Sequence, residues 1–202
     1  GSEMCIRDSK IGANMAVGAA AMTDSPFDSL AGMAVSGAET LVEQNRLALA
    51  GLGFGDETVE SYCRLVDTAF KAIVNGDMMP DPAVYDLPES LVQNYQAVAV
   101  QIRMPYFTRF LSLDMRPLLG DIECPVLALN GTKDNQVDHT SNLEAISKGL
   151  KANPKNVVES LDGLNHLFQH CKTGDVAEYR TIEETFAPEA LEKIVQWMSD
   201  FR

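Results

Sequence analysis

Two residues in the C-terminal part of the sequence have types and positions that suit acid–base chemistry. Asp134 follows an apolar run in the stretch NGTKDNQVD, and His166 follows a second β-like run in LDGLNHLFQH. A carboxylate that accepts a hydrogen bond from one imidazole nitrogen fixes the histidine tautomer, so the other nitrogen is free to take a proton. The structural alternative is a packed histidine beside Leu167 and Phe168, together with a turn-forming aspartate.

The segments around these two residues alternate between strand and helix patterns, as in an α/β protein. CPVLALNG contains a buried strand at residues 126–129, NVVESL contains the next strand, and a helix lies between them. Ser141 and Glu144 predict a capping box at the start of that helix. Because the carboxyl ends of parallel strands meet at one edge of a sheet, where ligands bind, we expect Asp134 and His166 to lie within hydrogen-bonding distance.

Both ends of the chain fit the same architecture. A small-residue apolar segment running to Met22 predicts a buried helix, which Asp24, Ser25 and Pro26 would end. The apolar run Leu30–Val35 predicts a short buried strand. A strongly amphipathic helix opens at Pro188 and closes the chain.

The middle of the chain is helical. Apolar residues recur every three or four positions in three segments, Glu39–Ala50, Asp56–Asn75 and Pro88–Arg103. We predict an inserted helical subdomain at residues 38–113. Its large apolar residues are interpreted as packing or, alternatively, as the lining of a pocket; they are Met78, Met79, Tyr106, Phe107 and Phe110.

Composition excludes several classes of partner and cofactor. The 202 residues carry a formal net charge of −13, which argues against binding to nucleic acids or to anionic membrane surfaces. No run of about 18 apolar residues and no basic-then-apolar leader is visible. The cysteines are far apart, with no metal-ligand or disulfide spacing, so neither a zinc site nor a compact disulfide framework is expected; they are Cys5, Cys63, Cys124 and Cys171.

Three stretches together resemble a known family. CPVLALNGTKDNQVD, GLNHLFQHCKTG and EETFAPEALEKIVQWM are similar to the C-terminal half of an α/β-hydrolase of the serine-esterase or serine-aminopeptidase-like group. The resemblance implies that Asp134 is the acid and His166 the general base of a Ser-His-Asp triad. It implies a small-molecule substrate with a carboxylic ester or related acyl bond, which is cleaved through an acyl-serine intermediate without a cofactor.

The resemblance also implies a division of the chain. Residues 11–37 would be a remnant of the α/β core, residues 38–113 a helical lid, and residues 114–202 the C-terminal part of the core. Residues 1–10 resemble translated sequencing-adapter read-through and are expected to be non-native. The expected fold is therefore an incomplete α/β-hydrolase fold.

The nucleophile expected from the resemblance is absent from the sequence. The family places its serine in Gly-x-Ser-x-Gly, and the nearest stretch, DSKIG, has Lys10 at the serine position, with Ser9 one residue out of register. We therefore expect the chain as printed to be inactive. Two alternatives remain open: a non-catalytic α/β binding or interaction module, and a cysteine nucleophile at Cys171 beside His170. An Asp-nucleophile phosphatase is disfavoured because no Asp-x-Asp-x-Thr run occurs.

Overall fold

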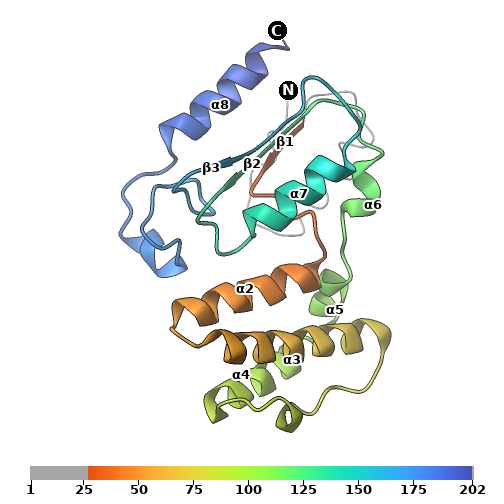
Figure 1. Ribbon diagram of the computed structural model, residues 1–202. Coiled ribbons are helices and arrows are strands. Elements are labelled where there is room, and N and C mark those ends of the chain that lie inside the picture. The colour runs from red at the N-terminus through yellow and green to blue at the C-terminus, as the bar shows by residue number, and fades with distance from the viewer. Residues whose placement is uncertain (1–26, 202) are drawn as a thin grey trace. The chain divides into compact units, whose positions relative to one another are not determined.

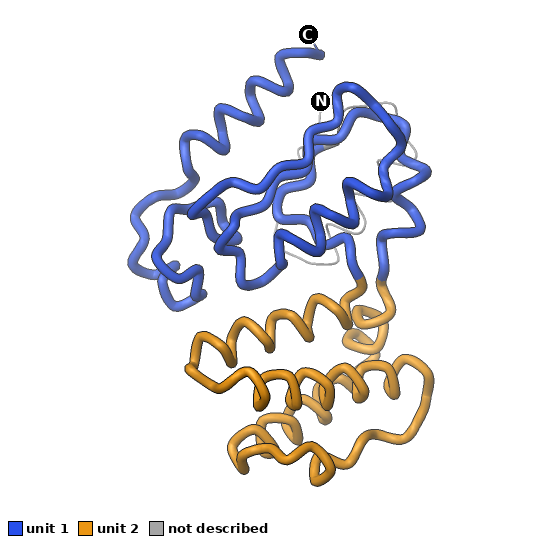
Figure 2. Tube along the Cα trace, viewed as in Figure 1, with its two compact units in different colours: residues 1–35, 114–202 blue, residues 36–113 orange. Residues whose placement is uncertain are grey.

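The computed structural model describes residues 27–201, and the chain divides into two compact units (Figure 2). The first unit combines residues 1–35 with residues 114–202, and the second unit is residues 36–113. The helix predicted up to Met22 and the DSKIG stretch lie outside the described residues. No helix within residues 27–201 has the length and apolar character needed to cross a membrane.

The first unit is an α/β structure built on a small parallel sheet, as the sequence predicts (Figure 1). Its strands are β1 (Phe27–Leu30), β2 (Val126–Gly131) and β3 (Val157–Leu161), in the order β1-β2-β3. All six residues of the central strand β2 are buried, which explains the apolar run Val126–Leu129. In the described part of this unit, three helices and a short 3₁₀ turn accompany the sheet: α6 (Arg116–Leu119), α7 (His139–Gly149), α8 (Pro188–Ser199) and η2 (Val176–Arg180).

Side chains that alternate along β2 bury both faces of the sheet. Val126 and Ala128 pack in one hydrophobic cluster with Ile146 of α7. Leu127 and Leu129 point the other way and pack in a second cluster with residues of α8, including Trp197. The two helices therefore cover opposite faces of the sheet (Figure 1), and the carboxyl edge of the strands is left to the loops that follow them.

The first strand differs from its sequence prediction. It ends at Leu30, where the predicted strand would begin, because Ala31 adopts a left-handed conformation with φ of 49°. Beyond it, the backbone N–H groups of Ala34 and Val35 donate to the side-chain oxygen of Asn142 in α7, at 2.7 and 3.1 Å. A side-chain amide thus replaces the strand ladder that the apolar run Leu30–Val35 suggests.

The start of α7 also differs from its sequence prediction. The helix begins at His139, and its N-cap is Asp138, whose carboxylate accepts from the backbone N–H of Ser141 at 2.7 Å. The capping box predicted at Ser141 and Glu144 is therefore wrong: Ser141 donates to a cap and does not form one.

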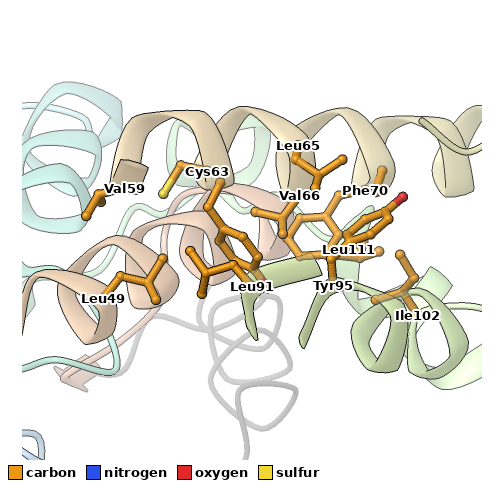
Figure 3. Packing of buried hydrophobic residues seen from close by; sticks show 12 residues of the cluster. Leu49, Val59, Cys63, Leu65, Val66, Phe70, Leu91, Tyr95, Ile102 and Leu111 are labelled. Atoms are coloured by element: carbon orange, nitrogen blue, oxygen red, sulfur yellow. The ribbon is translucent and has the colours of Figure 1, made fainter. Parts of the chain in front are cut away.

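The second unit is helical. It contains α2 (Gly37–Gly51), α3 (Asp56–Asn75), α4 (Glu89–Gln101), α5 (Pro105–Leu111) and the 3₁₀ turn η1 (Pro82–Val84). The apolar face of α3 lies at the centre of its core (Figure 3). The core includes Leu49, Val59, Cys63, Leu65, Val66, Phe70, Leu91, Tyr95, Ile102 and Leu111. Of the aromatic and methionine residues considered for a pocket, Phe110 is buried, whereas Met78 and Tyr106 are largely exposed.

The ends of the second unit are hydrogen-bonded to each other. The N–H of Gly37 donates to the carbonyl of Leu113 at 2.9 Å, and within the first unit the N–H of Met115 donates to Ala34 at 3.2 Å. A Cβ at Gly37 would lie only 2.8 Å from the carbonyl carbon of Phe110, so this close approach requires glycine. The chain therefore enters and leaves the helical unit side by side.

Candidate active site

Asp134 lies in the loop after β2, and that loop fixes its carboxylate. The Oδ1 atom accepts hydrogen bonds from the backbone N–H groups of Gln136 and Val137, at 2.8 and 2.9 Å. The loop is closed by Asn130 at the end of the strand, whose side chain donates to the carbonyl of Val137 at 2.9 Å. The Asp134 side chain is fully buried, so its second oxygen is directed by a rigid backbone rather than by solvent.

His166 lies in a tight turn after β3 that is organised by Asn165. The Oδ1 atom of Asn165 accepts from the N–H groups of Leu167 and Gln169, at 2.9 and 3.0 Å. The backbone N–H of Asn165 donates to the carbonyl of Gln169 at 3.0 Å, which closes the turn. Phe168 adopts a left-handed conformation with φ of 56°, and its carbonyl accepts from Ala187 at 2.7 Å. The turn is thus rigid and presents His166 at its tip.

The two loops approach each other through their backbones. The N–H of Thr132 donates to Leu161, and the N–H of Lys133 donates to Leu164, both at 2.9 Å. The approach depends on Gly131 at the end of β2. A Cβ there would lie 2.6 Å from the carbonyl carbon of Leu164. Only glycine leaves room for this contact, so Gly131 both ends β2 and allows the two loops to approach each other.

The structure brings Asp134 and His166 into direct contact. The distance from Nδ1 of His166 to Oδ2 of Asp134 is 2.8 Å, which confirms the contact predicted from the sequence. The His166 side chain is 18% exposed and the Asp134 side chain 0%. Because a carboxylate only accepts, the neutral imidazole carries its proton on Nδ1, and Nε2 is left as the acceptor of a further proton. This arrangement can act as a general base.

Residues 171–179 pack against the Asp134 loop. The ammonium of Lys133 donates to the carbonyls of Cys171 and Lys172, both at 3.0 Å, and Gln136 donates to the hydroxyl of Tyr179 at 2.9 Å. Burial raises the pKa of Tyr179, and the charge of Asp134 raises it further. Tyr179 is therefore a neutral phenol at physiological pH, and its hydroxyl holds the Asp134 loop through Gln136.

The surroundings of Cys171 disfavour it as a nucleophile. Burial raises the pKa of its thiol, and the neighbouring carboxylate of Glu178 raises it further. The thiol donates to the carbonyl of Gly163 at 3.6 Å. A reactive cysteine needs the opposite environment, one that lowers the thiol pKa and maintains the thiolate.

The other two histidines have different environments. His170 is 57% exposed and bridges two carboxylates, with Nδ1 at 3.0 Å from Glu184 and Nε2 at 2.8 Å from Glu189. His139 begins α7 and contacts Thr140 at 3.4 Å. Of the three histidines in the sequence, His166 is thus the one paired with a fully buried carboxylate.

No candidate metal centre is found among residues 27–201: these residues contain no group of three or more histidine, cysteine, aspartate or glutamate side chains that could hold a metal ion. The described cysteines, Cys63, Cys124 and Cys171, are free thiols.

The sequence predicts the contact between Asp134 and His166 but not the residues that hold the two side chains in place. No role is expected from the sequence for Gly131, Asn165 or Gln169. The available signal was the Asn-His pair itself, because an asparagine that precedes a short turn often bonds to the backbone two residues further on. Comparison of the chain with protein-family models, curated proteins and solved structures finds no significant match.

Proposed function

We propose that this chain carries the acid and the base of a serine hydrolase of the α/β-hydrolase type that acts on carboxylic esters or related acyl bonds. The proposal depends on one observation above all, the 2.8 Å contact between His166 and the fully buried carboxylate of Asp134. Burial of a carboxylate is costly unless it is paired, and here one oxygen takes two backbone N–H groups while the other faces the imidazole.

The pair would act on a serine hydroxyl at the Nε2 side of the ring. His166 takes the hydroxyl proton as the serine oxygen attacks the acyl carbon, and Asp134 stabilises the imidazolium that forms. The proton then passes to the leaving alcohol, which departs as the acyl-serine forms. In deacylation, His166 takes a proton from water as the water oxygen attacks the acyl carbon, and it then gives that proton to the serine oxygen as the acid is released. The printed sequence contains no Gly-x-Ser-x-Gly, so the serine would come from polypeptide outside it.

The location of the pair also supports the proposal. Both side chains follow parallel strands, β2 and β3, at the carboxyl edge of the sheet, where ligands bind in open α/β proteins. Within this proposal, the helical unit of residues 36–113 corresponds to the inserted lid of such a hydrolase.

The test uses the natural full-length polypeptide that contains these residues and a series of p-nitrophenyl acyl esters. We expect His166→Ala to lower kcat by roughly 10³-fold or more, and Asp134→Asn by a comparable or smaller factor. The double variant should be scarcely worse than His166→Ala alone, because the two residues act as one unit. His139→Ala, in a histidine outside the site, is the matched control and should retain full turnover.

A labelling experiment separates the proposal from a non-catalytic module. A fluorophosphonate probe should modify one serine of the full-length protein, and His166→Ala should slow that modification. Correctly folded His166→Ala protein with normal turnover would contradict the proposal. Absence of both turnover and labelling in the unmodified protein would favour a binding or interaction module in which Asp134 and His166 are structural.

A further inference from the structure

A pair of buried amides lies directly beneath the histidine turn. Asn165 is completely buried, and Gln169 is buried as well. The Nδ2 group of Asn165 donates to Oε1 of Gln169 at 3.2 Å, and the Nε2 group of Gln169 donates to the carbonyl of Glu184 at 2.7 Å. The side chains therefore form a short chain of hydrogen bonds from the turn to the segment before α8.

The contacts of Asn165 are placed on both sides of His166. Its Oδ1 atom binds the N–H of Leu167, the next residue after the histidine, and the N–H of Gln169, three residues after it. Its own peptide group precedes the histidine, and its N–H donates to the carbonyl of Gln169. Asn165 thus holds the backbone after His166 through its side chain and the backbone before it through its own N–H, and this backbone sets the direction in which the imidazole leaves the turn.

The chemistry of an amide suits this position better than that of other polar side chains. Asn165 must accept two hydrogen bonds at one atom and donate one at another, within a pocket that excludes water. Serine would supply a single oxygen at a shorter reach. Aspartate would keep the acceptor but lose the donor to Gln169, and it would place a charge where no cation lies in the contacts described.

We propose that Asn165 is a positioning residue for His166, and that its buried amide, paired with that of Gln169, holds the imidazole in line with Asp134. The residue does not touch the reacting atoms; it acts through the backbone of the turn. Displacement of the ring by about 1 Å is enough to cost on the order of 10²-fold in rate in a site that depends on alignment. The kinetic consequence rests on the proposed hydrolase function, whereas the effect on the His166–Asp134 contact does not.

The experiment uses the full-length protein and reads the contact directly by NMR. The proton on Nδ1 of His166, which is hydrogen-bonded to Asp134, should give a downfield resonance that disappears in His166→Ala. We expect Asn165→Ala to shift or broaden this resonance and to lower kcat roughly 10- to 100-fold with little change in KM. Asn165→Asp retains the acceptor for Leu167 and Gln169 but loses the donor to Gln169 and buries a charge, so it should recover only part of the resonance and of kcat.

A matched control separates positioning from general stability. Asn142 is an equally buried amide that binds two backbone N–H groups elsewhere in the same unit. Asn142→Ala should lower the melting temperature about as much as Asn165→Ala but leave the His166 resonance unchanged. Asn165→Ser, which keeps one acceptor, is measured beside the alanine variant and should give an intermediate shift, so the test does not depend on one variant folding.

The outcomes distinguish this proposal from the proposed function. An unchanged resonance in Asn165→Ala, or in Asn165→Ser if the alanine variant does not fold, would overturn the positioning role. Loss of the resonance in a protein that shows no turnover even before substitution would support the positioning role and refute the hydrolase. Loss of turnover in Asn165→Ala with an intact resonance would also overturn the positioning role, since the defect would then act elsewhere.

Discussion

Replacement of Gly131 by alanine tests how the two loops are held together. The added Cβ would lie 2.6 Å from the carbonyl carbon of Leu164, 2.9 Å from the carbonyl oxygen of Asn165, and closer still to the oxygen of Leu164. Non-bonded carbon atoms pack at about 3.5–4.0 Å, so the loops must separate by roughly 1 Å. The obstructing atoms belong to the backbone, so no side-chain rotation relieves the clash.

The separation should break two hydrogen bonds at once. The bond from Lys133 to Leu164 is 2.9 Å and the contact of His166 with Asp134 is 2.8 Å. A displacement of about 1 Å takes both beyond the range of a hydrogen bond. Overpacking costs about 1–3 kcal/mol and the lost backbone bond about 1 kcal/mol, so we expect the free energy of unfolding to fall by about 2–4 kcal/mol.

Urea unfolding of the full-length protein measures the stability loss, and the Nδ1 proton resonance of His166 measures the contact. Gly120→Ala is the control, because the nearest atom to a Cβ there is the carbonyl oxygen of Gly149 at 3.8 Å, an ordinary contact. It should leave both measurements unchanged. If Gly131→Ala unfolds at the same urea concentration as the unmodified protein and retains the resonance, the close approach of the loops is not what aligns the pair.

Two further predictions concern stability alone. Asn142→Ala leaves the buried N–H groups of Ala34 and Val35 without their acceptor, so we expect a loss of about 2–4 kcal/mol in urea unfolding; unaltered hydrogen-exchange protection at these two amides would contradict it. For His170, the hydrogen bond that its imidazole donates to Glu184, together with the charges of Glu184 and Glu189, raises the pKa above its ordinary value. A raised pKa stabilises the fold below the unfolded-state value, and this contribution is lost as the pH rises through the folded-state pKa. His170→Gln should therefore destabilise the protein at about pH 5.5 but hardly at about pH 8.5, and only slightly, because the pair is exposed. A difference that does not change with pH would refute this assignment.

Most helices could be predicted because their signals are local. Apolar spacing indicates α3 at Asp56–Asn75, as observed, and the same spacing indicates α8 from Pro188. The first strand could not be placed in this way. The apolar run Leu30–Val35 carries the signal of a buried strand, yet its N–H groups are bound by Asn142, a residue more than a hundred positions away. Only the folded chain shows that partner.

In the candidate site, too, some residues could be predicted from the sequence and others could not. Asp134 and His166 could be paired from the sequence because each follows a strand and parallel strands end at one edge. The supporting roles of Gly131 and Asn165 could not be predicted, because they depend on the folded conformation of the loops. Gly131 matters because another backbone lies against it, and Asn165 matters because of the turn that its side chain closes.

The hydrogen bond between Gly37 and Leu113 joins the two ends of the helical unit, so the unit is inserted at one point of the chain. The chain leaves the sheet-bearing unit after Val35 and returns at Asp114, and the bond from Met115 to Ala34 holds these two points together. A turn of a few residues could join them, since short connections of this kind are common between neighbouring segments. Evolution could therefore lengthen, shorten or exchange the helices while the strands and the Asp134–His166 pair stay in place.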